Sequence, residues 1–188
     1  MSISLSHKKV LILAAHGVDE TDMSTLMRTL LSAGAKPVVA SVEQGVLNSW
    51  SENTWGCCFP VDKHVSSILS FEYDVLIVPG GERSVAKLMQ NPHVDRVVTG
   101  FFDAGKAVAS MGAGVELLAN LKHIAGLTVS GVPTSKTVVE AEGVVWSDEA
   151  ISIDGYVLTG DSLQDRQALL AAVVDHIAHI EPLVQNAA

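Results

Sequence analysis

Three short segments hold the residues of this chain whose types and spacing could support chemistry. The first runs from His16 to Asp22, the second from Pro79 to Arg83 and includes Gly80 and Gly81, and the third from Ser110 to Gly114. A histidine or a carboxylate can transfer protons, and glycines allow backbone N–H groups to approach a bound anion or carboxylate closely. We therefore expect a small-molecule site in which acidic side chains and glycine-rich turns face one another.

Each of these segments follows a predicted strand. Residues 8–15, 73–78 and 106–110 are short apolar runs, which is the pattern of strands that are buried on both faces of a parallel sheet. In an open parallel sheet, ligands bind at the carboxyl ends of the strands. The three segments should therefore meet at one edge of the sheet.

The remaining pattern alternates strands with helices along the whole chain. Further strands are predicted at 36–42 and 156–159, and helices at 23–31, 82–90, 92–104, 112–118 and 164–180. Ser162 and Asp165 resemble a capping box at the start of the last helix. Residues 45–60 and 128–155 interrupt the alternation as hairpin-like excursions. The predicted fold is α/β, a doubly wound, mostly parallel, flavodoxin-like sheet with helices on both faces, in a single domain spanning 1–188.

Composition excludes several classes of partner. The 188 residues are 48% apolar, enough for a sizeable core, and carry a formal net charge of −9, which disfavours nucleic acid and anionic membranes. Apolar runs are too short to span a bilayer and the N-terminus does not read as a signal peptide, so we expect a cytoplasmic protein. Cys57 and Cys58 are adjacent in sequence and are expected to be free thiols.

Three sequence segments resemble the ThiJ/PfpI superfamily, the DJ-one-like group with a class I glutamine amidotransferase-like fold. They are Gly17-Val18-Asp19-Glu20-Thr21-Asp22, Val78-Pro79-Gly80-Gly81, and the run from Ala107 to Ala119. Their order and spacing fit this superfamily across nearly the whole chain. The resemblance implies an acid in the first loop, a nucleophilic cysteine on a strand-to-helix elbow, and a histidine after the elbow helix.

All three chemical positions implied by the resemblance have changed. The elbow cysteine falls on Met111, the glutamate on the shorter Asp22, and the histidine near Val132. A thioether has no proton to lose and cannot act as the nucleophile. We therefore expect a pseudoenzyme, a non-catalytic family member with a degenerate site.

This pseudoenzyme is expected to keep a pocket that binds a small molecule or a protein, with no cofactor and no metal. A small anion or a carbonyl compound would suit the pocket, and the elbow helix would point its N-terminus toward an anion. The pocket residues are expected to be His16, Asp22, Gly80, Gly81, Met111 and Gly112.

Two alternatives remain open. The chain could be a cysteine-independent hydrolase, hydratase or glyoxalase-like enzyme that uses Asp22, with His16 or Glu20, as acid and base. It could instead be a redox-responsive protein acting through Cys57 and Cys58, although no histidine or lysine stands beside them in sequence to lower a thiol pKa.

Two other motifs give only weak indications of a dinucleotide site and of a metal site. Gly112-Ala113-Gly114 lacks the third glycine of a dinucleotide loop. His176 and His179 share one helical face but have no evident third ligand, so we expect solvated surface histidines rather than a metal site.

The family commonly associates, which implies a homodimer. The excursion at 45–60 is rich in aromatic residues, which interface cores favour, and its candidate interface residues are Trp50, Trp55, Cys57 and Phe59. We expect this segment to supply the buried patch of the dimer.

Overall fold

The computed structural model describes residues 3–180 of the chain. Its α-helices are α1 (Glu20–Ser32), α2 (Glu82–Leu88), α3 (Pro92–Asp103), α4 (Gly114–Asn120), α5 (Lys136–Ala141) and α6 (Arg166–His179), and its 3-10 helices are η1 (Val65–Ser67), η2 (Ser70–Glu72) and η3 (Pro133–Ser135). Within these described residues, no helix has the length and apolar character that a membrane crossing requires.

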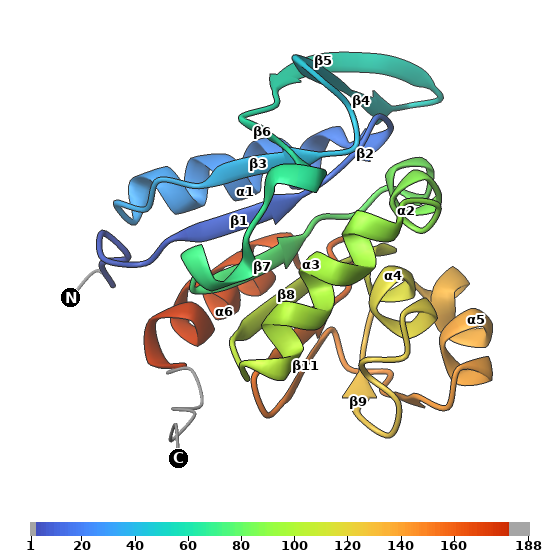
Figure 1. Ribbon diagram of the computed structural model, residues 1–188. Helices are drawn as coiled ribbons and strands as arrows, with labels where there is room; N and C mark the ends of the chain where they lie inside the picture. The colour runs from blue at the N-terminus through green and yellow to red at the C-terminus, as the bar shows by residue number, and fades with distance from the viewer. Residues whose placement is uncertain (1–2, 181–188) are drawn as a thin grey trace.

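The strands form one large sheet and two small ones. They are β1 (Val10–Leu13), β2 (Val18–Asp19), β3 (Val38–Ser41), β4 (Val46–Ser51), β5 (Thr54–Pro60), β6 (Lys63–His64), β7 (Val75–Val78), β8 (Ala107–Met111), β9 (Thr128–Val129), β10 (Val145–Trp146), β11 (Ile151–Asp154) and β12 (Val157–Gly160). The large sheet has seven strands in the order β11-β12-β8-β7-β1-β3-β6. All of its pairings are parallel except β11 with β12 (Figure 1). This confirms the predicted mostly parallel sheet.

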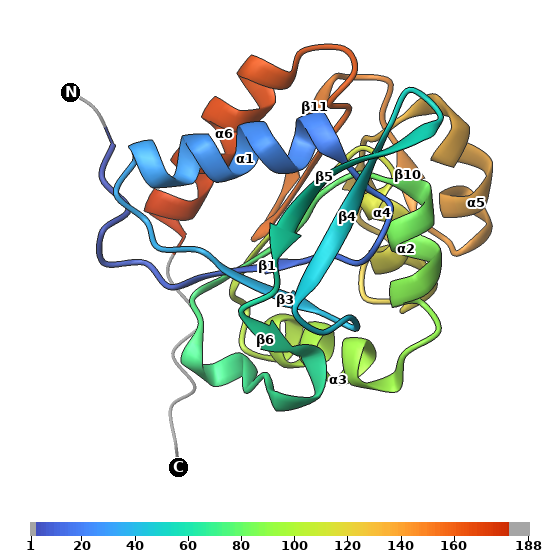
Figure 2. The ribbon, with the colours of Figure 1, turned by 90° about the horizontal axis from the view of Figure 1, so that it is seen from above.

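Two apolar layers cover the sheet, one on each face. Alternate residues of β1 separate between them: Leu11 and Leu13 pack with the core on the side of α2, α3 and α4, whereas Val10 and Ile12 pack on the other side. There they meet α1 and α6, which lie side by side in Figure 2. Because successive strand residues point to opposite faces, a continuous apolar run is required wherever both faces are covered.

The two excursions differ in structure. Residues 46–60 form the predicted hairpin, β4 and β5, which joins β2 in a three-stranded sheet with β5 at its edge. The prediction for 128–155 was wrong in form: the segment contains α5, a short parallel pair of β9 and β10, and β11, which joins the large sheet. Gly155, with φ of +59°, makes the tight turn that folds β11 back onto β12.

Two predictions about the last helix need correction. Asp165, not Ser162, is the N-cap of α6 and accepts from the Ala168 N–H at 2.9 Å. His176 is buried rather than solvated, with Nε2 at 2.9 Å from the Tyr156 carbonyl oxygen, while His179 is exposed. Helix α6 packs on the sheet through a broad face that includes His176.

Candidate functional site

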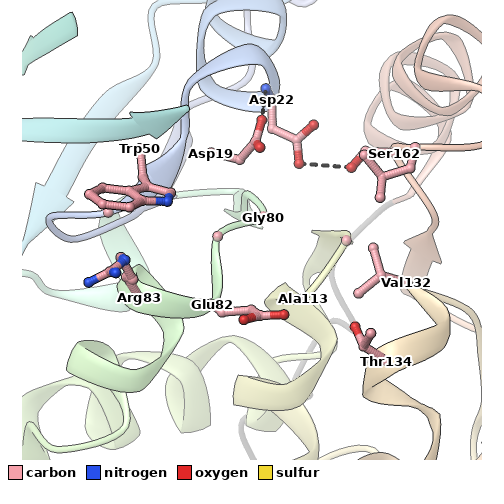
Figure 3. A pocket seen from close by; sticks show the side chains of 14 residues that line it. Asp19, Asp22, Trp50, Gly80, Glu82, Arg83, Ala113, Val132, Thr134 and Ser162 are labelled. Carbon is pink, nitrogen blue, oxygen red and sulfur yellow. Dashed lines mark hydrogen bonds between the residues drawn. The ribbon is translucent and has the colours of Figure 1, made fainter. Parts of the chain in front are cut away.

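A cavity of about 360 Å³ lies where the parallel strands of the large sheet end. Its walls come from the segments that follow β1, β7, β8, β9 and β12, including the first turns of α1 and α2, and from Trp50 of β4, as Figure 3 shows. Of the expected pocket residues, Asp22, Gly80, Gly81 and Gly112 line this cavity, and so does Val132. His16 and Met111 do not line it.

Asp22 is the buried acid of the cavity, with 1% of its surface exposed. Its Oδ2 accepts from the Ser162 hydroxyl at 2.9 Å and its Oδ1 accepts from Arg166 Nε at 2.9 Å. Burial, reinforced by the charge of Asp19, raises the pKa of Asp22 above its ordinary value, and the bonds from Arg166 and Ser162 only partly offset this. The carboxyl is thus a hydrogen-bond acceptor on both oxygens when ionised, and a stronger base than a surface aspartate.

The strand-to-helix elbow falls on Gly112 rather than on Met111. Met111 still pairs with Gly160 as the last residue of β8, and its side chain is fully buried in the core beneath α1 and α6. Gly112 has φ of +53°, the left-handed conformation that a sharp turn requires and that glycine adopts most readily. The expectation that Met111 occupies the elbow and lines the pocket was therefore wrong by one residue.

One N–H of the expected anion cradle is engaged within the protein. The Gly112 N–H donates to the Gly160 carbonyl oxygen at 2.9 Å, so it is not free for a ligand. Gly80 packs directly under Asp22, and a Cβ there would collide with Oδ2. Helix α4 has only 7 residues and offers little dipole. These glycines make room for Asp22 and for the turn.

A second wall is formed by an aromatic side chain and a cation. The Arg83 guanidinium lies 3.9 Å from the centre of the Trp50 ring, a cation–π contact between the first turn of α2 and strand β4 of the hairpin (Figure 3). Arg83 is outnumbered in the cavity lining by the carboxylates of Asp19, Asp22 and Glu82. Asp22 is paired with Arg166, so Asp19 and Glu82 leave the lining with an excess of negative charge over Arg83.

His16 faces the hairpin instead of the cavity. Its Nδ1 accepts from the Asn48 N–H at 2.9 Å, and its Nε2 lies 3.5 Å from a Glu43 carboxylate oxygen. The adjacent Gly17 N–H also donates to the Asn48 carbonyl oxygen, so the loop after β1 is tied to β4. This attachment turns His16 away from Asp22.

Glu20 is likewise committed to the hairpin. Its Oε2 accepts from the Ser49 hydroxyl and from the Cys57 N–H, both at 2.6 Å, and these bonds lower the pKa of Glu20. Cys57 and Cys58 are free and exposed on β5, outside the cavity lining. The structure therefore brings neither Glu20 nor the cysteines together with Asp22.

Sequence reasoning missed several residues of the site. Arg83 lies in the predicted loop 79–83 but was not singled out as a pocket residue, and Ser162 follows the end of β12, a position that was the signal that could have identified it. Arg166 is the first residue of α6, and no sequence motif marked it as part of the site. Within residues 3–180, no three His, Cys, Asp or Glu side chains gather in a way that would hold a metal ion.

Comparison with known proteins agrees with this architecture. Residues 8–176 match the family described as the DJ-1/PfpI family. A deglycase from Pyrococcus abyssi is 27% identical over 147 residues, covering 78% of this chain and 86% of the relative. A ThiJ/PfpI domain protein from Brachyspira murdochii has a similar structure, with a TM-score of 0.82, 20% identity, and coverage of 92% of this chain and 97% of the other. DJ-1beta from Drosophila melanogaster has a TM-score of 0.81 at 20% identity, covering 91% and 90%.

Proposed function

Because the chain belongs to the DJ-1/PfpI family, we propose that it keeps the family's pocket without its thiol chemistry and binds a small carbonyl-bearing molecule non-covalently. The observation that supports this is the elbow itself. Gly112 stands at the turn that follows β8 and has no side chain to act as a nucleophile, and the neighbouring Met111 is a buried thioether. The cysteines of the chain, Cys57 and Cys58, lie on β5 outside the cavity.

The curated relatives in this family include deglycases. A deglycase reaction that depends on an elbow cysteine has no counterpart group in this cavity, so we do not expect this chain to perform one. The charge balance of the lining supports a neutral ligand over an anion. The cavity, at about 360 Å³, is of a size for a small metabolite.

A second candidate has one observation in its favour. Asp22 combines a raised pKa with a hydrogen-bonded hydroxyl, Ser162, and such a buried carboxylate can act as a general base. The alternative is a cysteine-independent hydrolase, hydratase or glyoxalase-like enzyme in which Asp22 moves the proton. His16 and Glu20 are not partners in this alternative, because both face the hairpin.

One experiment separates these functions and the redox alternative. The purified natural chain is assayed for consumption of methylglyoxal and of an isonitrile, beside Asp22→Asn and the double variant Cys57→Ser, Cys58→Ser. We expect no turnover by any of the proteins, with saturable binding of carbonyl compounds to the natural chain. Turnover lost only in Asp22→Asn would support the acid–base enzyme. Turnover lost only in the double variant would support chemistry at Cys57 and Cys58. Either result would overturn the proposal.

A further inference from the structure

A second cavity lies at the end of the large sheet where its parallel strands begin. It has a volume of about 320 Å³, and its lining residues stand at or shortly before the first residues of β7, β1, β3 and β6, four neighbours in the sheet (Figure 1). The site around Asp22 lies where the strands end, and the two linings share no residue. We call the second cavity the lysine pocket, after Lys9, Lys36 and Lys63 in its lining.

The register of the strands places these three lysines on one face of the sheet. Lys9 and Lys36 each stand two residues before a pair of residues that are in register on β1 and β3, so they project from the same face. Lys63 is in register with Ala40, whose side chain packs in the core on that face. Three ammonium groups therefore surround one cavity.

The lining of the lysine pocket has a surplus of positive charge. Glu72 lines it as a carboxylate, and its Oε2 lies 3.5 Å from Lys63 Nζ. Among residues 3–180, no salt bridge joins Lys9 or Lys36 to a carboxylate. Three lysines and one glutamate leave two positive charges, in a chain whose formal net charge is −9. Like charges on neighbouring strands repel, so an anion bound between them would be stabilised.

Two further carboxylates lie close to the lysine pocket without lining it. Asp74 Oδ2 accepts from the backbone N–H of Lys9, and Asp62 Oδ2 accepts from the backbone N–H of Val39, each at 2.8 Å. These bonds tie loop carboxylates to the first residues of β1 and β3. The surface that a ligand would meet keeps its positive charge.

Tyr73 gives the lysine pocket a hydroxyl group and an apolar wall. Only 4% of its surface is exposed, and Lys63 Nζ lies 5.7 Å from the centre of its ring. A hydrogen bond with the Tyr73 hydroxyl raises the pKa of Lys63, so this ammonium group stays charged at neutral pH. Val10 and Val38 add apolar surface to the lining. The cavity thus suits an anionic group attached to a small apolar body.

We propose that the lysine pocket binds a small organic phosphate, with its phosphate group among the ammonium groups of Lys9, Lys36 and Lys63 and its organic part against Tyr73. The two surplus positive charges match the near-dianion that a phosphate monoester carries at neutral pH. Lysines recognise an anion as point charges, not through the planar bidentate pairing of arginine, which favours the higher charge of a phosphate over a carboxylate. This site goes beyond the proposed function and does not depend on it.

Three probes that share a benzene ring test the class of ligand. Phenyl phosphate, benzoate and benzyl alcohol carry a dianionic, a monoanionic and a neutral group at neutral pH. Their dissociation constants for the natural chain are measured by ligand-observed NMR titration at low ionic strength, in a buffer without phosphate. We expect phenyl phosphate to bind with a dissociation constant of about 1 mM or tighter, at least about threefold more tightly than benzoate, and benzyl alcohol to bind most weakly.

Two variants locate this binding in the lysine pocket. Lys9→Gln and Lys36→Gln each remove one exposed charge, and each should weaken phenyl phosphate about threefold or more while benzyl alcohol changes little. Lys122→Gln is the matched control, because Lys122 is also an exposed lysine but lies outside the lining, and it makes the same change in net charge. Asp22→Asn should leave phenyl phosphate binding unchanged, because Asp22 lines the other cavity.

The outcomes distinguish the lysine pocket from the cavity around Asp22. Phenyl phosphate that does not bind saturably, or that binds no better than benzoate, overturns the proposal. So does an affinity that survives both Lys9→Gln and Lys36→Gln, or that falls equally in Lys122→Gln. A change of phenyl phosphate affinity in Asp22→Asn alone would place the anion in the other cavity and would also overturn it. None of these results bears on whether the cavity around Asp22 binds carbonyl compounds.

Discussion

Arg166 donates from Nε to Oδ1 of Asp22 at 2.9 Å, although 144 positions separate the two residues. This ion pair orients the buried carboxyl so that its other oxygen meets the Ser162 hydroxyl beside the Gly112 elbow. The first turn of α1 and the start of α6 are thereby joined through a carboxyl that lines the cavity.

The position of the elbow predicts where an introduced thiol reacts. In a background with Cys57→Ser and Cys58→Ser, Gly112→Cys should be alkylated by iodoacetamide at least about tenfold faster than Met111→Cys, because only residue 112 lines the cavity while Met111 is fully buried. Rates are measured by mass spectrometry against pH, with the double-serine protein as the blank. Faster reaction of Met111→Cys would place the elbow one residue earlier.

The raised pKa of Asp22 predicts a pH dependence of stability. Below about pH 3.9 the carboxyl is protonated in both states. As pH rises above that value the unfolded chain releases the proton first, so the free energy of unfolding that Asp22 contributes falls until the folded carboxyl also ionises. Urea unfolding should therefore show Asp22→Asn gaining stability relative to the natural chain as pH rises through this acid range. If Asp22→Asn instead loses stability relative to the natural chain across this range, the hydrogen bonds from Arg166 and Ser162 lower the pKa of Asp22 more than burial raises it.

Burial of His176 predicts a second dependence, at higher pH. Desolvation disfavours the charged imidazole and lowers the pKa of His176, so the folded chain favours the neutral form of this histidine. The contribution of neutral His176 to the free energy of unfolding is fully present above about pH 6.5. It is lost as pH falls from there toward the folded-state pKa, because the unfolded chain binds the proton first. His176→Gln should lower the free energy of unfolding by about 1–2 kcal/mol at pH 7, and it should reduce the further decrease of that free energy between pH 7 and 5.

The control for His176 lies on the same helix. His179 is exposed, so His179→Gln should change the free energy of unfolding by no more than about 0.5 kcal/mol and should retain the slope with pH. Equal slopes for the natural chain and His176→Gln would contradict the assignment.

The exposed edge strand of the hairpin is the surface through which we expect two copies of the chain to associate. We propose a homodimer that uses the edge strand β5, where Trp55 is 51% exposed and Cys57 is also exposed, while Trp50 and Phe59 are partly buried within their own chain. Light scattering at micromolar concentration should give twice the monomer mass, and Trp55→Asp should reduce it to the monomer. Phe71→Asp is the control, because Phe71 is 76% exposed but lies on η2, away from β5. A monomeric natural chain would contradict the proposal.

Much of the fold was determined by the sequence alone. The apolar runs at 8–15, 73–78 and 106–110 predicted β1, β7 and β8, because a strand buried on both faces tolerates no polar alternation. The helical spacing of Met23, Leu26, Met27, Leu30 and Leu31 predicted α1. Met23, Leu26 and Leu30 are buried against the sheet, Met27 is partly buried and Leu31 is exposed. Because ligands bind at the carboxyl ends of parallel strands, the same pattern predicted that Asp22 and the glycine turns meet at one edge of the sheet.

Only the tertiary structure decided how that edge is completed. Whether β8 ends at Met111 or one residue earlier depends on its pairing with β12, and no local pattern distinguishes the two. Ser162 had the local pattern of a helix cap, but its hydroxyl donates to Asp22, and Arg166 joins the same carboxyl from a helix whose sequence shows no sign of it. Local periodicity reports which face of an element is apolar. Partners 140 positions apart are determined by how the elements pack, which is why the contact between Ser162 and Asp22 could be identified only in the folded chain.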